Sequence, residues 1–348
     1  MVGSMQQTSH IAFTGRHTAA SCLSDQEWAG LPYLAENQGQ LPPLVIAVDD
    51  RRWVSAAIEE IGLLRPVFLH GEVEGRRVGG VDMAIGTYCW QEGECPILVV
   101  ETQIGMPASE IVLREVLTYC SSHYHWFGRT LRTNGLTVIR VGTATGINAP
   151  GLPPLNRGDI VCGTRGMGWS GTLLQSLGGL DFFAPETLDS FQGRWNAMGF
   201  GFTPDMRFPL APCSPATIVS INTAASDLEI PLRRGGNFSI DSFYCEADTA
   251  ALIELRRKYG VLTFEMEQMA LMGISGLYAQ AGQVLHTGIV SSITGLIPSG
   301  SDSDAAVDSE LEVRSRGDAL RIAARALALS AMMEQDEDGS DFAESDTD

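Results

Sequence analysis

The chain has 348 residues, of which 44% are hydrophobic, and it carries a formal net charge of −19 at pH 7. This length can bury a sizeable core, whereas the acidic excess argues against nucleic acids and anionic membranes as partners, because both bind clustered Lys and Arg. With no apolar run of about 18 residues and no secretory signal pattern at its N-terminus, the sequence favours a cytoplasmic protein.

The predicted elements alternate between short apolar strands and helical patterns, which is typical of an α/β domain with a largely buried sheet. In chain order, strands are predicted at Leu44–Val48, Ile97–Thr102, Thr137–Thr143, Asp159–Gly163, Thr217–Thr223, Phe238–Tyr244, Leu262–Met266 and Val284–Ser291. Helices are predicted at Val54–Leu64, Ala108–Tyr119, Thr249–Tyr259, Gln268–Ala279 and Ala319–Met333. The segment 166–215 is dense in Gly, Pro and aromatic residues without a clear period, so we predict an irregular insertion there.

The two ends of the chain differ in composition from its middle. The first thirty residues are rich in Ser, Thr and Ala, and we predict a poorly packed N-terminal extension over residues 1–40. From Glu334 to Asp348, eight of fifteen residues are acidic, which predicts a disordered tail at 334–348. We therefore expect a single domain at 41–333.

The seven cysteines form no CxxC pair and have no His partners at zinc-ligand spacing. We expect reduced thiols, most of them packed inside the domain. No metal site is predicted from them.

Arg140 lies inside a predicted strand that otherwise reads as buried and that ends in a turn rich in Gly and Thr. Burying a guanidinium without an anionic partner is costly, so Arg140 requires either a carboxylate or a bound phosphate. A second Gly-containing turn, around Gly105, follows another apolar strand and opens a helix, as anion sites often do. The run Asp49-Asp50-Arg51-Arg52 follows the first strand and is either an exposed turn or a further source of arginine.

Two carboxylates, Glu265 and Glu267, flank Met266 at the end of a predicted strand. A carboxylate has two acceptor oxygens and can bind the two vicinal hydroxyls of a ribose. The alternative is a helix N-terminal glutamate that is stabilised by the helix dipole.

These motifs occur in the order shared by the hexameric-type nucleoside phosphorylases and the uridine phosphorylases, which the chain resembles over most of Leu44 to Met333. The segment Arg140–Thr143 resembles the family's Arg-x-Gly-Thr phosphate motif, and Gly158–Val161 resembles the Gly-Asp strand that follows it. The turn Ile104–Pro107 is similar to its Gly-x-Gly-x-Pro turn, Glu265–Glu267 to its Glu-Met-Glu ribose motif, and Asp241–Tyr244 to its base-pocket segment.

The resemblance implies a single-domain, three-layer α/β/α fold with a central mixed and partly barrel-like sheet. It implies phosphate-dependent cleavage of the N-glycosidic bond of a nucleoside, giving a free base and ribose 1-phosphate. Inorganic phosphate is then a co-substrate, and no organic cofactor is needed. The resemblance further implies a homodimer or a higher homo-oligomer, with room for a structural cation at a subunit interface.

Site residues are carried over from the family motifs position by position. The resemblance implies phosphate binding by Arg52, Arg140 and Thr143, ribose binding by Glu265, Met266 and Glu267, and base binding by Thr145, Gly146 and Phe243. Arg140 and Glu267 are the predicted catalytic residues.

Several positions depart from the family pattern. Val48 and Gln103 stand where the family has glycines, and its second phosphate arginine, from the partner subunit, has no clear counterpart here. Ser292 replaces the aspartate that protonates a purine, and the Gln-x-Arg pair that reads uracil is missing after Tyr244. Because a lost acid is harder to replace than two hydrogen-bond donors, we expect uridine-type substrates. The alternatives are a purine nucleoside phosphorylase, a nucleoside hydrolase and a non-catalytic nucleoside-binding protein.

Overall fold

The computed structural model describes residues 37, 40–69, 72–73, 76–77, 81–91, 93–178, 186–205, 207–242, 249–297 and 309–339. The strands are β1 (Leu44–Val48), β2 (Leu64–Leu69), β3 (Glu72–Val73), β4 (Arg76–Arg77), β5 (Met83–Trp90), β6 (Gly93–Glu101), β7 (His123–Trp126), β8 (Arg129–Arg132), β9 (Leu136–Ile147), β10 (Ile160–Met167), β11 (Gly201–Phe202), β12 (Pro209–Pro212), β13 (Leu232–Ser239), β14 (Val261–Glu265) and β15 (Leu285–Ile297). The helices are α5 (Arg51–Ile61), α6 (Met106–Leu117), α7 (Gly171–Gly178), α8 (Glu186–Ala197), α9 (Pro215–Asp227), α10 (Thr249–Tyr259), α11 (Gln268–Gln280) and α12 (Ser309–Gly339).

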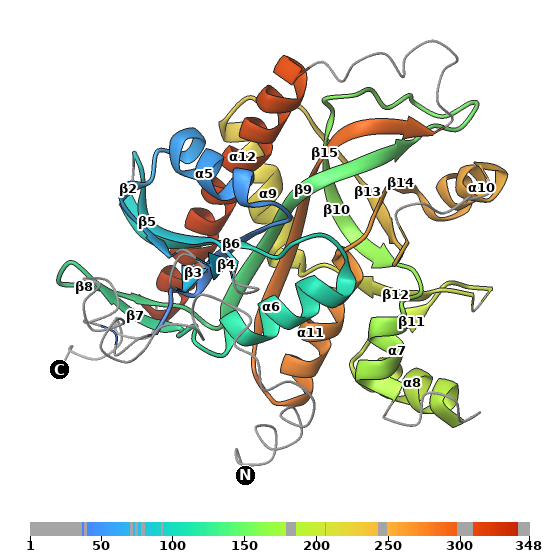
Figure 1. The fold of residues 1–348 in the computed structure, drawn as a ribbon, viewed down its shortest axis with the longest axis horizontal. Coiled ribbons are helices and arrows are strands. Elements are labelled where there is room, and N and C mark those ends of the chain that lie inside the picture. The colour runs from blue at the N-terminus through green and yellow to red at the C-terminus, as the bar shows by residue number, and fades with distance from the viewer. Residues whose placement is uncertain are drawn as a thin grey trace, which may run out of the picture.

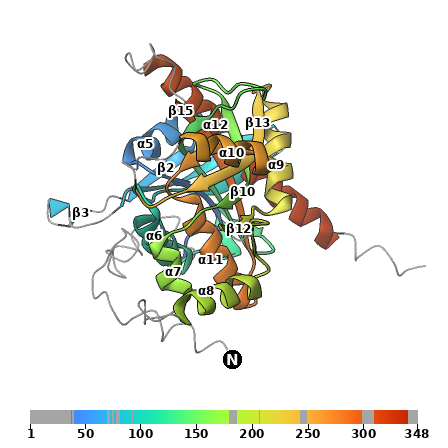
Figure 2. The same ribbon diagram turned by 90° about the vertical axis from the view of Figure 1, so that its right-hand side faces the viewer.

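One mixed sheet organises the domain, in the order β11-β12-β10-β13-β14-β9-β1-β6-β5-β2, and β15 pairs with both β9 and β10. The pairings β10 with β13, β13 with β14, β14 with β9, β9 with β15 and β15 with β10 close a ring of strands. Helices α5, α9 and α12 cover one face of the sheet, and α6, α7, α8 and α11 lie on the other (Figures 1 and 2). The predicted three-layer fold with a partly barrel-like sheet is confirmed.

Strand β1 lies between β6 and β9 and runs parallel to both. All five of its residues are buried, as expected for a continuous apolar run in a parallel sheet that is covered on both faces. Val48 pairs with Glu101, so β1 and β6 end at the same edge of the sheet, and the amide of Thr102 donates to the Val48 carbonyl at 2.6 Å. The turns that follow these two strands are therefore neighbours.

The strand predicted at Thr217–Thr223 is wrong, because these residues lie in helix α9. Their β-branched side chains favour a strand, but Ser214 is the N-cap of the helix and Pro215 occupies its first turn. The buried positions recur at helical spacing: Thr217, Ser220, Ile221, Ala224 and Ala225. Burial of this face outweighs the strand propensity of the individual residues.

The segment 166–215 contains regular elements, namely α7, α8, β11 and β12. Its aromatic residues pack on one another: the ring centroids of Trp169 and Phe191 lie 5.4 Å apart, and those of Trp195 and Phe200 lie 4.8 Å apart. This cluster rests on α11 where Gly276 leaves room, since a Cβ there would meet Met198 Sδ at 2.3 Å. The irregular composition therefore reflects aromatic packing of short elements.

Several predicted boundaries differ from the structure, those of β13 and α12 among them. Strand β13 begins at Leu232 and ends at Ser239, earlier than the predicted Phe238–Tyr244, and Tyr244 lies outside the described residues. Helix α12 runs over Ser309–Gly339, so the expected domain end at Met333 falls inside it. The glutamates and aspartates after Met333 remove apolar periodicity, but they do not break a helix as Gly or Pro would. Residues 1–36 and 340–348, which hold most of the predicted extension and tail, lie outside the described part of the chain.

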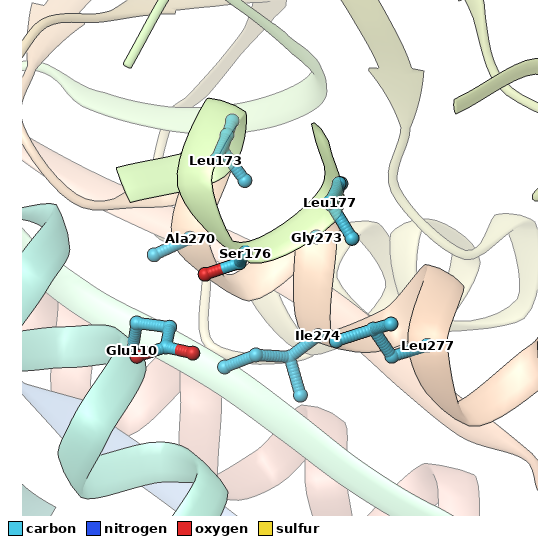
Figure 3. Close-up of a pocket in the computed structure, with 8 residues that line it drawn as sticks. All are labelled: Glu110, Leu173, Ser176, Leu177, Ala270, Gly273, Ile274 and Leu277. Carbon is cyan, nitrogen blue, oxygen red and sulfur yellow. The ribbon is translucent and has the colours of Figure 1, made fainter. Parts of the chain in front are cut away.

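A small pocket lies between α6, α7 and α11 (Figure 3). Apolar side chains including Leu173, Leu177 and Ile274 line it, with Glu110 and Ser176 as the polar members. It has room for about one water-sized sphere, so it is too narrow for a nucleoside. None of the described helices combines the length and apolarity that crossing a bilayer requires.

Candidate functional site

Arg140 lies in the middle of β9 and is only 2% exposed. Its register partners are Ala47 on β1 and Ile289 on β15, so it occupies the centre of the sheet. Its guanidinium lies over Gly142, where a Cβ would stand 2.7 to 2.9 Å from the two terminal nitrogens and the central carbon. Gly142 is therefore required for space: any larger residue would displace the guanidinium.

Three carboxylates surround the Arg140 guanidinium. Nη2 forms a hydrogen-bonded ion pair with Glu267 Oε2 and lies 3.8 Å from Asp49 Oδ2, while Nη1 lies 3.7 Å from Glu265 Oε2. These acids come from three places in the sequence, the end of β1, the end of β14 and the N-terminus of α11. Of the two partners that the sequence left open for Arg140, the structure gives it carboxylates.

The oxygens of Glu265 are occupied by donors from the protein. Its Oε1 accepts from Asn237 Nδ2 at 2.6 Å and from the hydroxyl of Ser239. Its Oε2 accepts from the backbone amides of Glu267 at 2.7 Å and Gln268 at 2.9 Å, at the start of α11. Thr263 donates in turn to Asn237 Oδ1 at 2.8 Å. Glu265 thus caps α11 and fixes the backbone of Glu267.

Glu267 is the N-cap residue of α11 and is 4% exposed. Its Oε1 accepts from the amide of Gly105, the N-cap of α6, at 2.8 Å. Two helix N-termini therefore meet at this carboxylate, and both favour negative charge. Burial nevertheless raises the pKa of Glu267 to about 7, against the opposing effect of Arg140 and with a smaller contribution from Glu265. Met266, between the two glutamates, is half-buried.

Asp49 completes the cluster, although the motifs did not identify it. Its Oδ2 accepts from the amide of Thr143 at 3.4 Å, and within the described residues its buried Oδ1 has no hydrogen-bond partner. Burial raises the pKa of Asp49, and Arg140 opposes the rise. The signal that could have found it is positional, because Asp49 follows β1, and Ala47 of β1 pairs with Arg140.

Arg52, expected at the phosphate, lies outside this cluster. Its side chain is 77% exposed and forms an ion pair with Asp50 at 2.8 Å. Asp50 is also the N-cap of α5 and accepts from the Arg52 amide at 2.7 Å. The side-chain hydrogen bonds from Arg52 lower the pKa of Asp50.

The remaining predicted residues follow Arg140 along β9 or lie outside the described chain. The structure brings Thr143 to the cluster through its backbone amide. Thr145 and Gly146 lie further along β9, where they pair with Phe264 and Thr263 of β14. Phe243 is outside the described residues, so the structure does not place the predicted base contact.

The structure shows the conformation or the contacts of two residues that depart from the family pattern. Gln103 has φ of 62°, a left-handed conformation that favours glycine, which accounts for the family's glycine at this point. Ser292, in place of the purine-protonating aspartate, is buried, and its hydroxyl lies 2.6 Å from that of Ser315 on α12. This position, in the middle of β15, therefore carries a neutral, locally satisfied side chain.

Across the described residues, no group of three His, Cys, Asp or Glu side chains is placed to hold a metal ion. The five described cysteines are free thiols, and only Cys89 is exposed. A cation at a subunit interface stays a prediction.

Comparisons with known proteins point to one family. A sequence model of the phosphorylase superfamily matches residues 54–329, a range that includes Arg140 and Glu267. No curated protein matches the chain. Among solved structures, the chain is similar to a purine nucleoside phosphorylase from Toxoplasma gondii in complex with immucillin-H, with 18% identity, 84% of this chain and 93% of that chain covered, and a TM-score of 0.58. At this identity the likeness establishes the fold.

Proposed function

The chain belongs to the phosphorylase superfamily, and from this membership we propose that it is a nucleoside phosphorylase that cleaves uridine-type nucleosides with inorganic phosphate. The observation that carries the proposal is the buried pair of Arg140 and Glu267 at the N-termini of α6 and α11. A guanidinium can donate charge-assisted hydrogen bonds to a phosphate, and a carboxylate can accept hydrogen bonds from the two vicinal hydroxyls of a ribose.

Donors remain on Arg140 for an incoming oxyanion. Its Nε and Nη1 are buried, and neither donates a hydrogen bond to any described residue. A phosphate oxygen there would form a bond to C1′ while the bond from C1′ to the base nitrogen breaks and its electron pair leaves with the base. Glu267 would hold the hydroxyls as the sugar gains positive charge, so that electrostatic positioning supplies most of the rate enhancement.

The charge of the cluster sets a condition on phosphate binding. One guanidinium faces three carboxylates, so a bound phosphate would add negative charge to a site that is already anionic when all three are ionised. Protonation of Glu267 relieves this repulsion, and its pKa of about 7 makes a proton available near neutral pH. We therefore expect phosphate to bind together with a proton.

The uridine preference rests on Ser292. Purine release requires an acid near the base, whereas Ser292 offers a hydroxyl that is already hydrogen-bonded to Ser315. The likeness to a purine nucleoside phosphorylase keeps purine nucleosides as competing substrates, although that likeness extends to the fold only.

A nucleoside hydrolase is the second candidate, and two observations favour it. Arg140 is compensated by carboxylates without phosphate, and Arg52, the other predicted phosphate ligand, has an exposed side chain paired with Asp50. In a hydrolase, water takes the place of phosphate, and a buried carboxylate such as Asp49 with a raised pKa could act as its general base.

One assay separates these functions. Purified protein is incubated with uridine, inosine or adenosine, with and without phosphate, and free base and ribose 1-phosphate are measured. Uracil release that requires phosphate supports the proposal, whereas base release at the same rate with and without phosphate indicates the hydrolase. Faster release from inosine or adenosine indicates a purine enzyme, and binding without cleavage indicates a binding protein. Arg140→Ala serves as the control for contaminating activity.

A further inference from the structure

A second buried arginine, Arg256, lies in the last turn of α10 and is 4% exposed. It donates through Nη1 to the carbonyl of Ile147 and through Nη2 to that of Pro153. In the described part of the chain no carboxylate forms an ion pair with it, and its Nε has no hydrogen-bond partner. Burial lowers the pKa of Arg256, and the positive charge of Arg233 lowers it further.

Arg256 belongs to a group of cations that we call the Arg256 cluster: Arg165, Arg233, Arg256, Arg257 and Lys258. Like Arg256, two other members donate to backbone carbonyls, Arg165 to Tyr259 and Arg257 to Pro150 at 3.3 Å. Among the described residues, Asp159 lies 3.6 Å from Arg233 and Glu254 lies 2.5 Å from Lys258, and the charge of Asp205 also acts on Lys258.

Five cations against three carboxylates leave an excess of positive charge at this surface, on a chain with 42 acidic and 23 basic residues. Arg233, Arg257 and Lys258 are exposed, so part of this charge faces solvent. They gather around the turn at Gly260, whose carbonyl accepts from the amide of Gly236 at 2.9 Å and ties α10 to β13. Such unbalanced like charges repel one another unless an anion neutralises them.

We propose that the Arg256 cluster binds the acidic C-terminal segment, Glu334–Asp348, of a second copy of this chain. That segment has eight acidic residues and no Lys or Arg, so its charge is complementary to the cluster. Every copy supplies one segment and one cluster, which makes the stoichiometry one to one. The net charge of −19 opposes nucleic acid, whose phosphates would meet a negative protein around a small positive patch.

The position of α12 explains why the segment comes from a partner. In Figure 1, α10 lies at the right of the molecule, while α12 runs from the top toward the lower left, away from α10. Because α12 ends away from the cluster of its own domain, it is better placed to present the segment to a neighbouring copy.

The contact must be weak pair by pair and sensitive to salt. Exposed ion pairs each contribute little, because water and ions screen them, but the contributions of several pairs on one segment add up. We expect the segment to strengthen an association of subunits that other surfaces also support. The proposal does not depend on which nucleoside reaction the protein catalyses.

The test uses a fluorescent synthetic peptide of residues Glu334–Asp348. The host is the full-length chain with its eight tail acids replaced by the corresponding amides, which leaves its own cluster unoccupied. Fluorescence anisotropy should show saturable binding that weakens between about 50 mM and about 500 mM salt. Adding Arg233→Glu, Arg257→Glu and Lys258→Glu to the host should weaken binding roughly tenfold or more.

The matched control reverses three exposed cations elsewhere, Arg51→Glu, Arg132→Glu and Arg314→Glu, and should leave binding unchanged. If the charge-reversed cluster fails to fold, the glutamine variants of the same three residues are measured instead. No binding to the tail-neutralised host, or equal binding after the cluster changes, would overturn the proposal. Equal competition by a single-stranded DNA of the same charge would also overturn it, because the surface would then bind any polyanion.

Discussion

Arg140 and Arg256 are both buried, at 2% and 4% exposure, yet their surroundings are opposite. Arg140 faces Asp49, Glu265 and Glu267, whereas Arg256 donates to backbone carbonyls and has cations as its charged neighbours. Carboxylates concentrate charge and couple the pKa values of the group, which suits chemistry on a substrate. Carbonyl dipoles satisfy the donors and leave the positive charge uncancelled, which suits attraction of an external anion.

The comparison predicts that loss of Arg140 has the largest effect. Arg140→Ala leaves three buried carboxylates without their cation, which should cost about 3–5 kcal/mol of unfolding free energy at pH 7. It should also remove most phosphorolysis, because the nucleophile loses its guanidinium. Urea unfolding and kcat/KM measure the two effects. Stability should recover partly toward pH 5, as Asp49 and Glu267, whose pKa values are raised by burial, take up protons. Near-normal activity with unchanged phosphate affinity would contradict the assigned role.

The second prediction concerns pH. Glu267 has a folded pKa of about 7, above its ordinary 4.5, so the folded protein holds more protons than the unfolded chain between these values. Unfolding free energy should therefore fall as pH rises from about 5 to about 7, by at most about 3 kcal/mol from this group. Asp49 acts in the same direction, because burial raises its pKa. Urea titrations at several pH values measure the slope.

Glu267→Gln provides the control for that slope, since an amide cannot titrate and its hydrogen bonds keep nearly the same shape. The variant should lose less stability between these pH values than the unchanged chain. An identical slope in both proteins would assign the proton uptake to Asp49 or to another group.

The same substitution yields the third prediction, on activity. If Glu267 holds the ribose hydroxyls in the transition state, Glu267→Gln should lower kcat and kcat/KM for ribonucleosides by roughly ten- to a hundredfold, the value of a charge-assisted hydrogen bond. The loss should be smaller for 2′-deoxynucleosides, which have one hydroxyl fewer. Equal losses on both substrates would restrict Glu267 to its hydrogen bond with the Gly105 amide and its ion pair with Arg140.

Removing Arg256 should have a smaller effect than removing Arg140. Arg256→Met keeps the buried stem but leaves the carbonyls of Ile147 and Pro153 without their donor, which should cost about 1–3 kcal/mol of unfolding free energy. The loss should be nearly independent of pH between 5 and 8, because the described residues place no carboxylate in contact with this guanidinium. A cost as large and as dependent on pH as that of Arg140→Ala would mean that the two arginines are compensated in the same way.

Sequence patterns located the parts of the site but not how they are connected. The strand Leu44–Val48 and the motifs around Arg140 and Glu267 could be predicted because each depends on a local run of residues. The binding of Glu265 by Asn237 joins segments that lie 28 residues apart and have no shared pattern. The inclusion of Asp49 depends on the register between β1 and β9, which no local pattern specifies.

Arg52 shows a different limit of the sequence. The family motif predicted a phosphate ligand, but Asp50, two residues before it, binds its guanidinium and caps α5. Asp at an N-cap is a local signal that the sequence does contain. It indicates a helix start without indicating whether a nearby arginine will turn toward the cap or toward a ligand.

The smallest predicted effect comes from Gln103, in the turn that leads to Gly105 and Glu267. Its φ of 62° is unfavourable for a residue with a Cβ by about 1–2 kcal/mol, whereas glycine adopts this conformation freely. Against this gain, a glycine increases the conformational entropy of the unfolded chain, which costs about 0.5–1 kcal/mol. Gln103→Gly should therefore raise the unfolding free energy by less than about 1 kcal/mol, measurable as a small increase in Tm.

Gln103→Ala is the matched control, since alanine keeps the Cβ and therefore the backbone strain, and it should give no such increase. Gly105 donates to Glu267, which is paired with Arg140. A relaxed turn would therefore alter the stability of the cluster around Arg140 and leave that of the cluster around Arg256 unchanged. A destabilised Gln103→Gly variant would show that the glutamine side chain makes a contact that compensates for the strain, and that the turn depends on this contact more than on its backbone geometry.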